Sequence, residues 1–205
     1  MIYQVLIIAF IVSYLGSIPP GTINVTTMQM TVLGHSRGAF FFALGASLTE
    51  FVYAGATVKL QVFLSERPFI IENFQIITAI VMLVLGAANL LGRVTKPKAL
   101  SSNQLKGRNG FKRGFVLGIL NPLTVPFWLA ITAYLQSNEW IILPGVYFWV
   151  YLTGISTGTF ALLLTVRFIG AKFQRVADNS FLVQKIPGII FIVLGAYNLY
   201  DWLVV

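Results

Sequence analysis

Two apolar segments of the sequence are each interrupted by proline and polar residues. The interruptions comprise Pro20, Gly21, Thr22 and Asn24 in the first segment, and Asn121, Pro122 and Thr124 in the second. Proline removes a backbone donor and clashes with the preceding turn, so each break frees backbone N–H and C=O groups. The freed amides at the start of the next half-helix can bind a carboxylate, and the freed carbonyls can bind a cation or an ammonium group.

We interpret these breaks as a candidate substrate-binding site. The alternative is a packing kink, because neighbouring helices can satisfy the freed backbone groups. The occurrence of two breaks at matching positions favours the functional interpretation.

Glu50 is the acidic residue that lies well inside an apolar segment. A charge at the bilayer centre costs ~2.5–3.5 kcal/mol on the insertion scale, so such an acid faces a cavity, is paired or is protonated. Ser47, Tyr53 and Thr57 share its helix face. We predict that Glu50 and Tyr53 contact substrate and that Glu50 binds an ammonium group or couples a proton. A buried carboxylic acid hydrogen-bonded within the bundle is the alternative.

Other polar residues in apolar segments have simpler interpretations. Lys59 lies nine residues from Glu50 on the opposite helix face, where its side chain could reach the headgroups, with substrate contact as the alternative. Asn89 and Asn198 are expected to form a structural polar pair, with lining of the pathway as the alternative. We find no nucleophile–base pair, phosphate-binding loop or metal-spaced cluster. The sequence therefore predicts no catalytic residue, no metal site, no cofactor and no enzyme activity.

The composition is that of an integral membrane protein. Of 205 residues, 57% are hydrophobic and 10% are charged. The net charge of +8 is explained by basic residues between apolar segments, so nucleic-acid binding is not expected. Zero cysteines exclude disulfides and thiolate metal sites. The first apolar segment starts directly after Met1 without a basic region, so we interpret it as a span and not as a signal peptide.

The apolar segments predict an all-α fold of six transmembrane helices, with the first and fourth helices broken. The expected spans are 2–32, 38–64, 70–92, 111–136, 142–166 and 183–204. Twelve of the 14 lysine and arginine residues then lie on one side, which we assign to the cytoplasm. Both termini are predicted to face outward, in the plasma membrane and specifically a bacterial inner membrane.

The sequence also contains an internal repeat. Residues 84–90 return as residues 193–199 with six of seven identical, an offset of 109 that also relates Gly45 to Gly154 and Ser47 to Ser156. Three spans per unit, an odd number, would make the halves inverted repeats. We predict units at 1–92 and 111–205, joined by a basic cytoplasmic linker at 93–110. The basic segment 93–113 could also contact anionic lipids.

The order of these motifs resembles the lysine exporter (LysE/RhtB) superfamily of small-molecule exporters. The resemblance rests on the break from Pro20 to Asn24, the Gly-rich second span that carries Glu50, and the Asn121-Pro122 break. It covers essentially the whole chain and implies export of amino acids or similar metabolites, driven by the membrane potential or a proton gradient. Thr22 stands where the second proline is usual, which suggests a divergent branch and leaves lysine unsupported as the substrate.

The sequence therefore predicts a secondary-active exporter of amino acids or related small zwitterions that works by alternating access. Two alternatives stay open: an exporter of inorganic cations, and a non-transporting membrane scaffold or enzyme subunit. Small residues on the helices would permit a homodimer.

Overall fold

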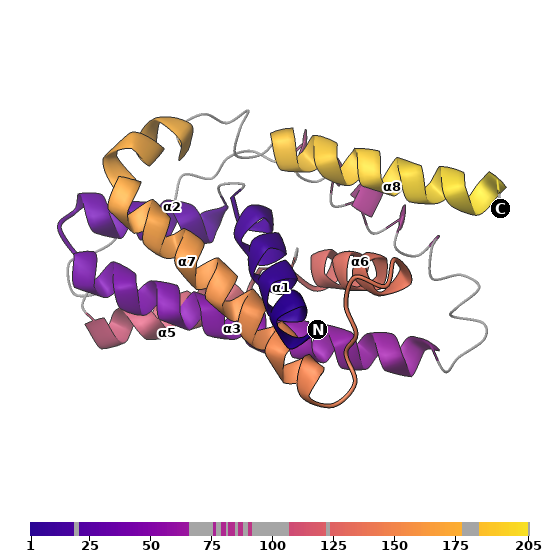
Figure 1. Ribbon diagram of the computed structural model, residues 1–205. Helices are drawn as coiled ribbons and strands as arrows, with labels where there is room; N and C mark the ends of the chain where they lie inside the picture. Colours follow the sequence, from indigo (N-terminus) through magenta and orange to yellow (C-terminus); the bar gives the residue numbers. More distant parts are fainter. Residues whose placement is uncertain are drawn as a thin grey trace.

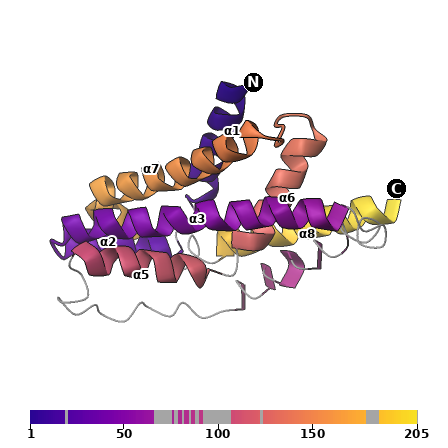
Figure 2. The ribbon, with the colours of Figure 1, turned by 90° about the horizontal axis from the view of Figure 1, so that it is seen from below.

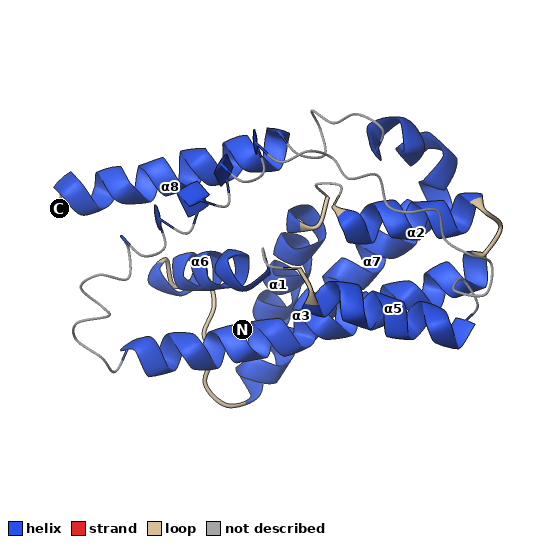
Figure 3. Cartoon of the chain, turned by 180° about the vertical axis from the view of Figure 1, so that it is seen from behind, coloured by secondary structure: helices blue, strands red, loops and turns tan. Residues whose placement is uncertain are grey.

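The computed structural model describes residues 1–18, 21–65, 107–121, 124–177 and 185–204, together with separate positions between 76 and 91. All regular structure in these residues is helical, as Figure 3 shows. The helices are α1 (Ile2–Gly16), α2 (Thr22–Val32), α3 (Ser36–Ser65), α5 (Gly107–Ile119), α6 (Thr124–Ser137), α7 (Val146–Ala177) and α8 (Ile186–Val204). The predicted all-α class is confirmed for this part of the chain.

Membrane-spanning character is clearest in the two longest helices. Ser36–Phe63 of α3 and Val146–Gly170 of α7 are each long and apolar enough to cross a bilayer. A third candidate is the pair of α5 and α6, which is bent by 67° at its break. The predicted count of six spans stays a prediction, because most of the expected span 70–92 lies outside the described residues.

Both segments that we expected to be broken are pairs of helices. The helix α1 ends at Gly16 with Ser17 as its C-cap, and α2 begins after Gly21. In the second segment, α5 ends at Ile119 and α6 begins at Thr124. Pro19, Pro20 and Pro122 themselves lie outside the described residues.

Some boundaries differ from the predicted ones. The helix α7 begins at Val146 and not at 142, because Pro144 and Gly145 form a turn in which Gly145 has a φ of 65°. It continues to Ala177, beyond the apolar segment, since lysine and arginine are good helix formers. The helix α5 begins at Gly107, inside the segment 93–110 expected to be a linker.

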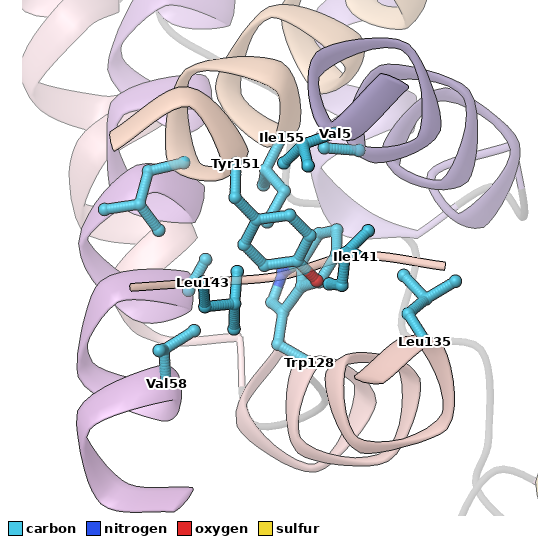
Figure 4. Close-up of a cluster of buried hydrophobic side chains, with 11 residues drawn as sticks. Val5, Val58, Trp128, Leu135, Ile141, Leu143, Tyr151 and Ile155 are labelled. Carbon is cyan, nitrogen blue, oxygen red and sulfur yellow. The ribbon is translucent and has the colours of Figure 1, made fainter. Parts of the chain in front are cut away.

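The long helices α3 and α7 organise the fold. Figures 1 and 2 show α5 alongside α3, and α7 crossing α3 and α1. Hydrogen bonds between Ser36 and Arg167 and between Ser47 and Ser156 show that α3 and α7 run antiparallel. The main apolar cluster is built from α1, α3, α6 and α7 and includes Val5, Val58, Trp128, Leu135, Tyr151 and Ile155 (Figure 4).

The close contact between α3 and α5 recurs between α7 and α1. In each contact a glycine lies against the carbonyl of one residue and the amide of the residue four positions later: Gly45 against Phe111 and Phe115, and Gly154 against Leu6 and Phe10. A side chain at either glycine would clash with the backbone of the facing helix. Small residues thus set the helix spacing at both places.

The repeated segments of the sequence also contact each other. The contacts are formed by Gly86 against Gly188 and Ile192, and by Gly195 against Ala79 and Leu83. Each partner in the first contact is separated by 109 residues from its counterpart in the second. The interface between α8 and the described residues from 79 to 90 is therefore reciprocal in this part of the chain.

Candidate functional site

The first break leaves the start of α2 open and closes the end of α1. The N-cap of α2 is Gly21, which has no side chain to cap the first amides of the helix, and both Gly21 and Thr22 are exposed. The Asn24 side-chain amide donates to the Ser17 carbonyl over 2.7 Å. The start of α2 thus presents the positive end of the helix dipole, while Asn24 satisfies a carbonyl on the other side of the break.

The second break is closed in a similar way by a different residue. The Tyr53 hydroxyl donates to the carbonyl of Ile119, the last residue of α5. Asn121 follows in the connecting turn and is half-buried. Thr124, the first residue of α6, is only 3% exposed. A predicted site residue therefore donates to one backbone carbonyl at each break.

Glu50 lies on α3 where α6 begins. Its Oε2 accepts from the Trp128 indole Nε1–H over 2.7 Å, and its Oε1 lies 3.5 Å from the Thr124 hydroxyl. Within the described residues, no lysine, arginine or histidine forms an ion pair with it. The Glu50 carboxylate is thus held by neutral donors, so its charge is available to a cation or a proton.

Trp128 is a site residue that the sequence analysis missed. It is 2% exposed and packs edge-on against Phe127 and Tyr151, in the cluster of Figure 4. It lies four residues after Thr124, so the two share one face of α6. Extending the face of Thr124 by one helical turn would have identified it.

The elements that flank the two breaks contact each other. Gly16, at the end of α1, packs against the ring of Phe127 in the first turn of α6. Ile23, at the start of α2, and Leu117, near the end of α5, pack against the same apolar cluster. The fold thus brings together two segments that are about one hundred residues apart in the sequence.

Comparison with known proteins decides the family. The sequence profile of the LysE type translocators matches residues 14–201. The chain belongs to the LysE type translocator family. It is 25% identical over 194 residues to the "Putative amino acid efflux protein YcgF" of Bacillus subtilis (strain 168), with 90% of each chain covered. No solved structure matches the chain significantly. The resemblance to LysE exporters is therefore confirmed.

In this LysE-type translocator the repeat counterpart of Glu50 is Thr159, which lies in a cluster of hydroxyl groups. The Thr159 hydroxyl is 2.8 Å from that of Ser13 and 3.3 Å from that of Ser17. Ser13 also donates to the Ile155 carbonyl over 2.7 Å. Ser13 is a second residue that the sequence analysis missed, because it precedes the break by a full turn. Two positions related by the sequence repeat thus differ in chemistry.

The remaining predicted site residues of this LysE-type chain are placed only in part. Lys59 is exposed, as expected for a side chain that reaches the headgroups. Pro20, Pro122 and Asn89 lie outside the described residues, and so does the side chain of Asn198. The roles of these four residues stay predictions.

Proposed function

We propose that this chain is a secondary-active exporter of amino acids or related small zwitterionic metabolites. The observation that carries the proposal is the position of Glu50: an acid near the middle of a membrane helix, held by Trp128 and Thr124 and without a basic partner among the described residues. An acid there is costly, and an intramembrane acid commonly marks a substrate or proton pathway. The family and the efflux relative support an exporter.

The two poles of a zwitterion fit the two kinds of group at the breaks. The open N-terminus of α2 at Gly21 and Thr22 favours the substrate carboxylate, and Glu50 favours the ammonium group. Asn121, Thr124 and Tyr53 line the second break beside Glu50. In this proposal Pro20 and Pro122 keep both breaks open.

The proposed mechanism is alternating access between two inverted halves. The contacts that Gly86 and Gly195 each make with the other segment are equivalent under the repeat. This supports a two-fold relation, because in a two-fold interface each residue repeats the contact of its counterpart. The Ser156 hydroxyl donates to the carbonyl of Ser47, and these repeat equivalents can meet only near the axis. The antiparallel course of α3 and α7 fits an axis in the membrane plane.

Proton coupling would follow from competition at Glu50. The deprotonated carboxylate binds the ammonium group of the substrate on the cytoplasmic side. After the substrate leaves on the outer side, the carboxylate takes one proton there and releases it into the cytoplasm when the site faces inward again. One substrate leaves and one proton enters in each cycle.

The test is efflux from proteoliposomes under an imposed pH gradient. Amino acids released by cells with and without the chain are compared first, and the amino acid with the largest difference is then used as the labelled substrate. We expect Glu50→Gln to abolish acceleration by the gradient, because glutamine neither carries the charge nor takes up the proton. Glu139→Gln, at an exposed acid in the turn after α6, is the matched control and should transport at the wild-type rate.

Two outcomes would overturn the proposal. If no amino acid is released in excess by cells that contain the chain, export of amino acids is wrong. If Glu50→Gln transports at the wild-type rate with the same response to the gradient, Glu50 is not the coupling group.

A further inference from the structure

The face of α3 that carries Glu50 continues as a polar stripe beyond the site already described. Thr57 lies seven residues after Glu50 and Gln61 lies eleven residues after it, so all three project from nearly the same side of the helix. Thr57 is 1% exposed. Gln61, four residues later, is half-buried and adjoins Thr57 on the helix surface.

Within the described part of the chain, both side chains carry a buried oxygen without a hydrogen bond. The Thr57 Oγ1 and the Gln61 Oε1 atoms are covered and have no partner among these residues. A buried polar atom left unpaired costs ~1–3 kcal/mol, and native proteins contain few of them. Two such atoms one helical turn apart therefore require an explanation.

Thr57 differs from five other threonines of the described helices. These five donate their hydroxyl to the carbonyl four residues earlier, namely Thr27, Thr31, Thr153, Thr157 and Thr165. Thr57 could reach its own backbone in the same way but does not. Its hydroxyl is therefore available to a group that does not belong to α3.

The chemistry of the two oxygens defines the missing group. The amide oxygen of Gln61 can only accept a hydrogen bond, and the Thr57 hydroxyl can accept one as well. The missing group must therefore be a hydrogen-bond donor or a cation, and a primary ammonium group is both. An acceptor such as a carboxylate would leave the Gln61 oxygen unsatisfied and close to a like partial charge.

Thr57 and Gln61 lie between Glu50 and the C-terminal end of α3. With a rise of 1.5 Å per residue, Thr57 lies ~10 Å and Gln61 ~16 Å beyond Glu50. Half of the hydrocarbon core is ~15 Å thick. Val58, next to Thr57, points into the apolar cluster of Figure 4, so the stripe borders a well-packed part of the protein.

We propose that Thr57 and Gln61 form a second binding station, which takes a primary ammonium group through its N–H donors after that group leaves Glu50. This inference rests on the proposed export function, because it gives the ammonium end of the substrate a route along α3. The station holds the ammonium group weakly, with neutral oxygens, so that the group can leave again.

The absence of cysteine from the natural sequence makes the test direct. Thr57→Cys is introduced, and the purified protein is treated with two thiol reagents, aminoethyl methanethiosulfonate and sulfonatoethyl methanethiosulfonate. The first carries a primary ammonium group and the second a sulfonate. Asn138→Cys, in an exposed turn, supplies the intrinsic ratio of the two rates. Thr27→Cys, at a buried position whose hydroxyl is bonded to Ile23, is the buried control.

The measured quantity is the labelling rate with the ammonium reagent divided by the rate with the sulfonate reagent. We expect this ratio to be about tenfold higher at Thr57→Cys than at Asn138→Cys, which is the effect of one hydrogen bond to a charged group. Adding Gln61→Leu should abolish this preference, because it removes the remaining acceptor. Thr27→Cys should stay unreactive. Gel filtration of each variant checks that it is folded, and Gln61→Cys with Thr57→Val provides the reverse pair.

Several results would overturn the station. One is a Thr57→Cys thiol that reacts with neither reagent, and another is a Thr57→Cys thiol that reacts with both at the ratio of Asn138→Cys. A preference that survives Gln61→Leu would also contradict it. Because no amino acid is used, the labelling result is independent of efflux: loss of the preference with intact efflux rejects the station alone, and absent efflux with an intact preference rejects the export proposal alone.

Discussion

At the scale of single residues, the chemistry of the site depends on what surrounds Glu50. The two donors, Trp128 and Thr124, both come from the first turns of α6. Neither can neutralise the carboxylate, although both can orient it. These donors thus hold the carboxylate in place without cancelling its charge. The cation-binding role that we propose for Glu50 requires both properties.

Replacing Trp128 with phenylalanine tests the importance of this orientation. Phenylalanine keeps an aromatic ring against Tyr151 and removes the indole N–H that donates to Glu50. A hydrogen bond to a charged group contributes ~1.5–3 kcal/mol, so we expect efflux from proteoliposomes to fall by about tenfold or more. Trp149→Phe, at an exposed tryptophan of α7, should change efflux little. Equal rates for Trp128→Phe and the wild type would show that the indole only fills space.

At the scale of helices, glycine sets how closely the elements approach. A side chain at Gly114 of α5 would clash with the backbone of Phe42 and Ala46 in α3. At Gly170 of α7 the nearest atoms belong to the Thr31 side chain, at 3.5 Å and 3.6 Å, which is ordinary contact. The same substitution should therefore have opposite effects at the two positions.

We expect Gly114→Ala to destabilise the protein and Gly170→Ala to leave it unchanged or stabilise it. Overpacking costs ~1–3 kcal/mol, whereas alanine in a helix is ~0.5–1 kcal/mol better than glycine when space allows. The measurement is the thermal midpoint of the purified variants, which should fall by about 2–4 °C per kcal/mol for a chain of this size. Similar midpoints for both variants would mean that α5 can move away from α3 at little cost.

At the scale of the whole molecule, the proposed inverted arrangement predicts where equivalent turns lie. The turn between α2 and α3 contains His35, and the connection between α6 and α7 contains Asn138. Figures 1 and 2 show these connections at opposite ends of α3 and α7. An odd number of spans per repeat requires opposite sides of the membrane for them.

The orientation can be measured with single cysteines in the cysteine-free chain. In intact cells, a membrane-impermeant sulfonate thiol reagent should label Asn138→Cys and Tyr3→Cys. His35→Cys should be labelled only after permeabilisation, because basic residues favour the cytoplasmic side. Labelling of His35→Cys and Asn138→Cys from the same side would contradict the inverted repeat, and labelling with the sides exchanged would contradict only the predicted orientation.

The sequence by itself determined the class of the protein, its broken segments and its family. Apolar segments of this length favour lipid, and proline beyond the first turn of a helix interrupts it, so these features follow from local chemistry. The matching positions of Gly86 and Gly195 likewise followed from the repeat alone. The exact bounds of α7 did not, because the turn at Pro144 and Gly145 delays its start and lysine and arginine extend its end beyond the apolar part.

Only the tertiary structure decided which groups meet at the site. Glu50 could have faced lipid, a basic residue or the first break; packing of α6 against α3 placed Trp128 and Thr124 beside it. The hydroxyl cluster of Ser13 and Thr159 and the unpaired oxygens of Thr57 and Gln61 depend in the same way on neighbours far away in the sequence. Helical periodicity tells which residues share a face, but only the packing of distant helices tells what that face meets.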